Sequence, residues 1–424
     1  MSFKLNVLED AANDKKGLSV RSYKDYKLYK YVKNMMDASS VSSVSDLGRY
    51  RSVITDKDFN IRCFAPPKTL RSDVLYNEYM KGDFKRVDAT TYKNGEYMVR
   101  IEEFIEGTMI NVYYHNDQWR IATKSMIDAN GKFFNREKSF SDMFYEILNA
   151  QNLKLDCLDE KYVYSFTMQH PENRIVGNHA EMRLYLTNMY QIDGETILSI
   201  DPRKITPTEE QQSFFKHIPA EMSFEEGNIT PEDMVNFKVV YDYMTSLVDS
   251  KQYETMGLVI YVEQYEGVNK TFEMRAKVRN PLYEKVRHIR GNQPKLAYRF
   301  CELYLSGTLE EFYEYYPEHQ MAMKQMEMSV SKFIQTLYKN YRNCYIRKEK
   351  PLKEYEYAYK NHMYQLHEHY KKMLLPRHLK IEVTDVRSYI KSLHPSQLMY
   401  SISRMNGLWE TKENTEVRDT ETHE

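Results

Sequence analysis

The spacing of apolar residues along this chain changes near residue 290, and this change limits the folds that the chain can adopt. From about residue 48 to 290, short apolar segments alternate with turn residues, which is typical of strands joined by tight connections. One hairpin is expected to run along 108–114, turn at 115–117 and return along 119–123. Because strands joined by short turns pair antiparallel, this part of the chain predicts an antiparallel sheet.

Four more strands and one helix are expected within the same part of the chain. The strands are predicted at 162–168, 182–189, 258–262 and 272–278. Ser139 or Ser141 has the side chain of a helix N-cap. The apolar residues that follow fall on one face of a helix: Met143, Phe144, Ile147 and Leu148.

Beyond residue 290 the spacing of apolar residues is helical. Phe333, Leu337 and Tyr341 recur every four residues and therefore share one helix face. Pro351 and Pro376 interrupt this periodicity and are expected to separate helices. The fold class predicted is α+β, with an antiparallel-sheet domain followed by a helical carboxy-terminal domain.

The sequence divides into four predicted parts. Residues 1–47, rich in lysine and tyrosine and then in serine, are expected to form an N-terminal helical segment with a loop. Residues 48–290 form the sheet domain and 291–408 the helical domain. Residues 409–424 are charged and lack apolar periodicity, which predicts a disordered tail.

Composition narrows the functional classes. A formal net charge of -1 gives no general basic field, so nucleic-acid binding would have to come from local patches. The 4 cysteines form no CxxC pair, which disfavours a zinc ribbon or a disulfide framework. The first residues lack the apolar core of a signal peptide, and no apolar run approaches the roughly 20 residues of a membrane helix. A cytoplasmic protein without a membrane partner is expected.

Seven short motifs carry most of the functional information. They are Tyr-Arg-Ser-Val-Ile at 50–54, Cys-Phe-Ala-Pro-Pro-Lys at 63–68, Glu-Phe-Ile-Glu-Gly-Thr-Met-Ile at 103–110, Ile-Ala-Thr-Lys-Ser at 121–125, Tyr-Ser-Phe-Thr-Met-Gln-His-Pro-Glu-Asn-Arg-Ile-Val at 164–176, Met-Gly-Leu-Val-Ile at 256–260 and Ala-Lys-Val-Arg-Asn-Pro-Leu-Tyr at 276–283. In this order they resemble the T4-type RNA ligases, which are covalent nucleotidyltransferases, and the RNA-ligase-like proteins of large DNA viruses. The resemblance implies an ATP-grasp-like nucleotidyltransferase domain that uses ATP and Mg²⁺, and an RNA partner.

Three departures from the family pattern concern its chemistry. The family lysine that attacks the α-phosphate of ATP stands three residues before the motif glycine. That glycine is Gly107 here, so Phe104 occupies the position of the nucleophile. Thr167 and Met256 likewise stand where the family has glutamates that orient the ribose and Mg²⁺. No catalytic residue and no metal-ligand set is therefore predicted.

Other residues of the family site are retained. The resemblance implies that the nucleotide is bound by Arg51, Lys68, Glu106, Gly107, Lys124, Lys277, Arg279 and Tyr283. Any one of these cations alone is more typical of a solvated strand face. Their ordered placement favours phosphate contacts by Lys68, Lys277 and Arg279. For Glu106, an acid beside a turn is favoured over a metal contact.

Three hypotheses on function stay open. The first is a pseudoenzyme that binds a nucleotide or an RNA end without forming a covalent adenylate. The second is an active, divergent RNA ligase with an unusual nucleophile. The third is a structural protein whose helical region binds protein partners. The basic, tyrosine-rich stretch 339–372 could track RNA, although a solvated helix face is favoured. His362 and His369 are interpreted as helix histidines rather than metal ligands.

Overall fold

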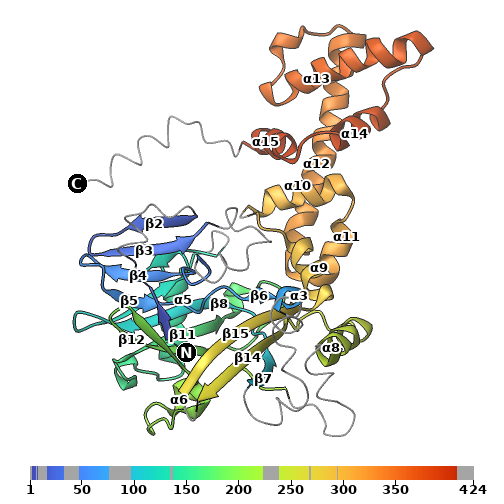
Figure 1. The fold of residues 1–424 in the computed structure, drawn as a ribbon. Helices are drawn as coiled ribbons and strands as arrows, with labels where there is room; N and C mark the ends of the chain where they lie inside the picture. Colours follow the sequence, from blue (N-terminus) through green and yellow to red (C-terminus); the bar gives the residue numbers. More distant parts are fainter. Residues whose placement is uncertain are drawn as a thin grey trace. The chain divides into compact units, whose positions relative to one another are not determined.

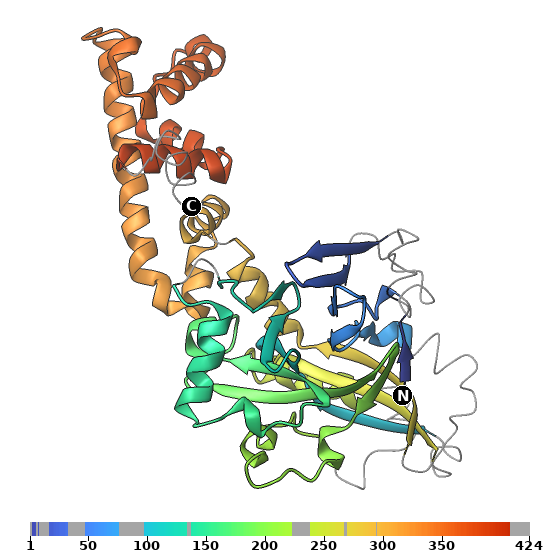
Figure 2. The same ribbon diagram turned by 90° about the vertical axis from the view of Figure 1, so that its left-hand side faces the viewer.

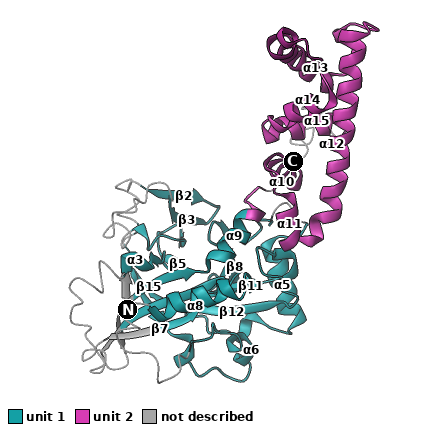
Figure 3. Ribbon diagram, turned by 90° about the vertical axis from the view of Figure 1, so that its right-hand side faces the viewer, with its two compact units in different colours: residues 1–288 teal, residues 289–424 magenta. Residues whose placement is uncertain are grey.

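The computed structural model describes residues 2–5, 7, 17–32, 47–75, 97–133, 137–222, 238–266, 269–293 and 295–407. These residues group into two compact units, 1–288 and 289–424, which are coloured separately in Figure 3. The first unit contains sheets and the second contains helices, as Figure 1 shows. The predicted α+β class, with antiparallel sheet first and helices after it, is therefore confirmed.

The first unit is built around a seven-stranded sheet in which every neighbouring pair is antiparallel. Its strands, in spatial order, are β1 (Ser2–Lys4), β13 (Thr196–Ile200), β12 (Arg183–Asp193), β11 (Tyr162–Gln169), β8 (Thr108–Tyr114), β9 (Trp119–Thr123) and β10 (Met126–Ile127). The predicted hairpin is β8 and β9. Its turn places Asn116 and Asp117 at positive φ, a conformation that asparagine and aspartate tolerate.

Two four-stranded sheets complete the first unit. One consists of β2 (Leu18–Ser22), β3 (Tyr26–Tyr31), β4 (Val53–Asp56) and β5 (Ile61–Phe64). The other consists of β6 (Leu70–Arg71), β15 (Asn269–Arg279), β14 (Gly257–Glu266) and β7 (Tyr97–Glu103). The strands that were expected at 162–168, 182–189, 258–262 and 272–278 are β11, β12, β14 and β15.

The large sheet is covered on both faces. On one face, Tyr113 and Tyr190 pack into a core with the β2–β5 sheet, and Tyr190 meets Phe64 edge to face. On the other face lies α5 (Phe140–Ala150), whose predicted apolar residues are all buried. Ser139, one of the two serines predicted as N-cap, begins this helix and forms a capping box with Asp142.

The predicted helix in residues 1–47 is wrong where the structure describes it. Residues 18–22 and 26–31 form the antiparallel pair β2 and β3. Tyr26 and Leu28, two residues apart, are both buried in the core, and β3 also pairs with β4. Tyrosines on a paired, half-buried strand outweigh the helical preference of the lysines between them. The serine-rich loop and the predicted tail at 409–424 lie outside the described residues.

Smaller helices complete the first unit. They are α3 (Ser72–Val74), α6 (Gln212–Phe215), α8 (Lys238–Asp249) and α9 (Pro281–Arg290), the last of which ends at the boundary of the two units. Val240, Met244 and Leu247 of α8 pack against buried residues of β14 and β15. This packing fixes one face of β15 in the core and leaves the other face for the site.

The second unit is helical. Its helices are α10 (Leu296–Ser306), α11 (Leu309–Tyr315), α12 (Gln320–Tyr341), α13 (Tyr357–His369), α14 (Val383–Lys391) and α15 (Pro395–Met405). Figure 2 shows α12 as a long helix beside which the later helices pack. Phe333, Leu337 and Tyr341 belong to its buried face, as predicted. Pro351 lies between α12 and α13, and Pro376 lies in a 3₁₀ turn between α13 and α14. Among the described helices, none has the length and apolarity to cross a membrane.

Gly257, at the start of β14, is held where a side chain cannot fit. Its φ is +143°, and a Cβ would collide with the carbonyl oxygen of Val278 and lie 2.9 Å from Cα of Arg279. The carbonyl oxygen of Gly257 accepts the backbone N–H of Phe104 at 2.9 Å. This glycine therefore brings together two segments that carry residues of the family motifs.

Replacing Gly257 by alanine is expected to lower the free energy of unfolding by about 3 kcal/mol, because the new Cβ must displace backbone. Gly194→Ala is the matched control, since Gly194 has φ +57° but nothing within 4 Å of its Cβ position. Only the backbone cost of about 1 kcal/mol should remain in the control. Urea-induced unfolding followed by circular dichroism compares the two variants. Equal losses would show that the close approach at Gly257 does not matter.

Candidate functional site

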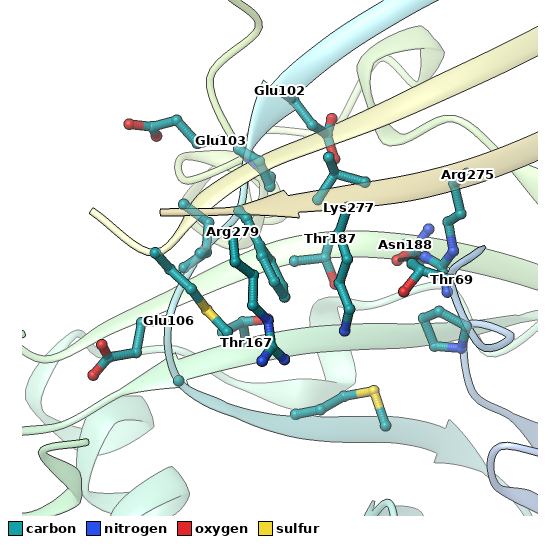
Figure 4. A pocket seen from close by; sticks show the side chains of 18 of the residues that line it. Thr69, Glu102, Glu103, Glu106, Thr167, Thr187, Asn188, Arg275, Lys277 and Arg279 are labelled. Atoms are coloured by element: carbon teal, nitrogen blue, oxygen red, sulfur yellow. Dashed lines mark hydrogen bonds between the residues drawn. The ribbon is translucent and has the colours of Figure 1, made fainter. Parts of the chain in front are cut away.

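A cavity of about 260 Å³ opens in the first unit between the large sheet and the sheet that contains β14 and β15 (Figure 4). The large sheet contributes Met109, Thr167, Thr187 and Asn188, and the other sheet contributes Val259, Tyr261, Arg275, Lys277 and Arg279. The segment that joins β7 to β8 adds residues 104–107, and α9 adds Tyr283 and Arg287. The cavity lies close to the lower limit of about 300 Å³ for small-molecule sites.

The alternation of β15 aims three cations into this cavity. Arg275, Lys277 and Arg279 are two residues apart, so their side chains leave the same face of the strand. Ala276 and Val278 point the other way, into the core with α8. Figure 4 shows the side chains of Arg275, Lys277 and Arg279 directed to the same side of β15.

Lys277 is the cation with the most altered ionisation. Burial, followed by the positive charges of Arg279, Arg51 and Arg275, lowers the pKa of Lys277 to about 7. Its Nζ lies 5.1 Å from the centroid of the Phe104 ring. The described lining contains Glu102, Glu103 and Glu106, but among the described residues none of these forms an ion pair with the ammonium group of Lys277. Without a bound anion, the cavity therefore favours the neutral form of Lys277.

Arg51 adds a further positive charge from outside β15. Its Nη1 donates a hydrogen bond to the carbonyl oxygen of Pro66 at 3.4 Å. Burial, followed by the charge of Arg275, lowers the pKa of Arg51 to about 10. Within the described ranges no carboxylate is paired with Arg51. Like-charged groups that lower one another's pKa in a common cavity form an environment suited to an anion.

Arg279 is partly neutralised from α9. Its Nη1 donates to Oε1 of Glu284 at 2.7 Å, and its guanidinium lies 5.9 Å from the ring centroid of Phe104. Tyr283, on the same helix, is fully buried, and burial together with the charge of Glu106 raises the pKa of its hydroxyl. Phe104 thus lies beneath Lys277 and Arg279, two of the three cations for which the sequence analysis expects phosphate contacts.

The carboxylate of Glu106 accepts hydrogen bonds from backbone amides of the protein. It accepts the backbone N–H of Val176 at 3.0 Å and of Gly177 at 3.1 Å, and lies 3.6 Å from Nε2 of His179. Burial alone would raise the pKa of Glu106, but the nearby ring of His179 and the hydrogen bonds from the two amides outweigh it and lower the pKa. Glu106 thus joins residues 176–177, which follow β11, to the segment that contains Gly107.

The structure brings together most of the residues that the resemblance implies. Those that line the cavity are Arg51, Glu106, Gly107, Lys277, Arg279 and Tyr283. Lys68 and Lys124 do not line it, and both instead approach Tyr31 of β3. Their Nζ atoms lie 5.9 Å and 4.8 Å from its ring centroid. Two cations of the lining, Arg275 and Arg287, were missed by sequence analysis; for Arg275, its position two residues before Lys277 on a strand was the available signal.

All three positions that depart from the family pattern face the same cavity. Phe104, Thr167 and Met256 come from three separate segments and all belong to its lining. Gly107 allows this close arrangement, because a Cβ there would lie 2.8 Å from Cγ2 of Thr167. The three positions at which the sequence analysis expects departures from the family pattern therefore lie in one site.

Comparison with known proteins gives one sequence relative. No protein-family model matches this chain. The RNA ligase of Rhodothermus phage RM378 is 26% identical over 261 residues, which cover 54% of this chain and 55% of that protein. The chain thus spans about half the length of this curated relative. Over that stretch the chain is similar to an RNA ligase.

Several solved ligases are similar in structure. A putative ATP-dependent DNA ligase from Aquifex aeolicus has a TM-score of 0.36 and 14% identity, with 86% of this chain and 80% of that chain covered. An archaeal ATP-dependent RNA ligase has a TM-score of 0.38 and 12% identity, with 75% of this chain and 74% of that chain covered. A Naegleria gruberi RNA ligase mutant with AMP and Mn has a TM-score of 0.31 and 14% identity, with 52% of this chain and 57% of that chain covered.

The Lys277 amine is expected to titrate near pH 7, well below an ordinary lysine, because burial and four arginines oppose its charge. The ε-carbon chemical shift of ¹³C-lysine-labelled protein measures this, and Lys277→Gln assigns the resonance. Arg279→Gln should raise the midpoint, since it removes one neighbouring charge. A Lys277 resonance that titrates only above pH 9 would contradict this electrostatic description.

Proposed function

We propose that this RNA-ligase-like nucleotidyltransferase binds ATP or the phosphate of an RNA end without forming a lysyl-adenylate. The observation that supports the proposal is the ring of Phe104, which lies under Lys277 and Arg279. By the resemblance, Phe104 stands where the family has its nucleophile. The cations that would hold a phosphate are present, while the amine that would attack it is replaced. A phenyl ring has no lone pair and cannot form the phosphoramidate bond.

The residues of the cavity fit the phosphates better than they fit Mg²⁺. A divalent ion of this kind prefers carboxylate and water oxygens. By the resemblance, Thr167 and Met256 replace the family carboxylates. Of the glutamates in the described lining, Glu102 is paired with Arg100 and Arg203, Glu106 accepts two backbone amides, and Glu103 is exposed. In the described part of the chain, no group of three His, Cys, Asp or Glu residues could hold a metal ion. We therefore propose that the cations of this chain, rather than a protein-bound metal, neutralise the phosphate.

The alternative of an active ligase has one residue in its favour. Lys277 is an amine in the cavity whose lowered pKa leaves part of it neutral near pH 7. A bound phosphate would reverse that effect, because an anion beside the amine favours its protonated form. Lys277 is then a better phosphate contact than a nucleophile, which favours binding without chemistry.

Replacing Lys277 and Arg279 together by glutamine should weaken ATP binding by about 100-fold or more, since each charge-assisted contact contributes about 1.5–3 kcal/mol. Equilibrium dialysis with labelled ATP in EDTA measures the affinity without a metal. A matched control is Lys161→Gln with Arg183→Gln, because these surface cations pair with Asp159 and Glu181. Unchanged affinity in the cavity variant would favour a purely structural protein.

Covalent chemistry is tested by incubation with α-labelled ATP and Mg²⁺, followed by a denaturing gel. The wild-type chain is expected to carry no label, because Phe104 has no nucleophilic atom. Phe104→Lys alone should also stay unlabelled, since the carboxylates at 167 and 256 are still missing. The variant Phe104→Lys, Thr167→Glu, Met256→Glu is expected to regain detectable labelling, because it restores nucleophile and carboxylates to one cavity.

A labelled wild-type protein would overturn the proposal, and the position of the adduct would say why. An adduct on Lys277, located by mass spectrometry, would establish a relocated nucleophile and therefore an active ligase. A folded triple variant without label would mean that the cavity has lost more than these three side chains.

A further inference from the structure

A second concave site lies in the helical unit. A groove of about 790 Å³ is enclosed by α13, the end of α14 and α15. Its lining combines three tyrosines, Tyr357, Tyr389 and Tyr400, with the side-chain amides of Asn361, Gln365 and Gln397. Lys360 also lines it, and none of its described lining residues is acidic.

The floor of this groove is a chain of hydrogen bonds through His362. The hydroxyl of Tyr389 lies 2.8 Å from Nδ1 of His362, and Nε2 lies 2.7 Å from Oγ of Ser401. Ser401 in turn donates to the backbone carbonyl oxygen of Gln397 at 2.8 Å. Burial lowers the pKa of His362 to about 4, so the ring is neutral and each group has its partner. The floor is therefore rigid before any ligand arrives.

The rim of the groove is held by an arginine between aromatic rings. The guanidinium of Arg404 lies 4.6 Å from the ring centroid of Tyr357 and 4.9 Å from that of Tyr400. Tyr357 is nevertheless 67% exposed, so much of its ring remains open to a ligand. An aromatic ring braced by a cation is a rigid surface for stacking, and such surfaces bind bases with little regard to sequence.

The amides supply the second element of base recognition. Asn361 and Gln365 stand four residues apart on α13, so both carboxamides face the groove from neighbouring turns. A carboxamide offers a donor and an acceptor, as does the edge of every base. Ala358 and Leu393 are the only aliphatic residues among the described lining, which is little for an apolar peptide.

We propose that this groove binds an unpaired base of single-stranded RNA. The base stacks on Tyr357, its edge meets the amides of Asn361 and Gln365, and Lys360 contacts the adjoining phosphate. Single strands suit such a site because their bases can leave the stack, whereas bases in a duplex cannot. The site belongs to the second unit alone, so it does not depend on nucleotide binding in the cavity of the first unit.

Fluorescence anisotropy of a labelled 12-residue oligouridylate with the full chain tests this site. Tyr357→Ala should weaken binding by about 5-fold or more, the loss expected for one stacked base, whereas Tyr357→Phe should retain it. The matched control is Tyr364→Ala, because Tyr364 lies on the same helix and is 50% exposed but is absent from the groove lining. The control should bind as the wild type does.

Further experiments distinguish binding in this groove from binding in the cavity of the first unit, and an unpaired base from other ligands. Tyr357→Ala should cause the same loss in a Lys277→Gln, Arg279→Gln background, so a failure of nucleotide binding in the first unit leaves the test intact. Excess duplex RNA should not displace the oligomer, and free uridine monophosphate should compete only weakly. Equal affinity of wild type and Tyr357→Ala, an equal loss in Tyr364→Ala, or monophosphate binding as tight as the oligomer would overturn the proposal.

Discussion

The mutual repulsion of cations in one cavity is the constraint on which the functional description depends. Arg51, Arg275, Lys277 and Arg279 meet there, while the nearby carboxylate of Glu106 is bonded elsewhere. The result is a lysine whose pKa falls to about 7. Because an unfolded lysine binds its proton up to a higher pH, Lys277 contributes more to stability as pH rises between those two values. A purely structural protein gains nothing from this arrangement, whereas a phosphate relieves it.

Much of the fold could be predicted because its local patterns are strong. The β8–β9 hairpin, the capped helix at Phe140–Ala150 and the buried face of α12 all follow from spacing and end signals. The paired strands at 18–31 could not be read in this way, because their lysines and tyrosines match a helix nearly as well. What decides between the two is pairing with β4, a contact with residues far along the chain.

The site was predictable only in part for a related reason. Ordered motifs mark positions along strands, and strand alternation then explains why Lys277 and Arg279 share a face and why Arg275 joins them. Alternation says nothing of how three sheets pack, so the placement of Lys68 and Lys124 beside Tyr31 required coordinates. The groove beside His362 was also beyond the sequence, since its residues come from helices whose packing the sequence does not specify.

The most direct measurement is the proton uptake that accompanies nucleotide binding. If a phosphate restores the charge of Lys277, binding of ATP at pH 8 takes up close to one proton, because a group with a pKa near 7 is about nine-tenths neutral there. Calorimetry in buffers of different ionisation enthalpy counts that proton, and Lys277→Arg, which stays charged, should abolish the uptake while retaining binding. Binding without proton uptake in the wild-type chain, or uptake that persists in Lys277→Arg, would contradict the proposal that the phosphate binds in the cavity beside Lys277.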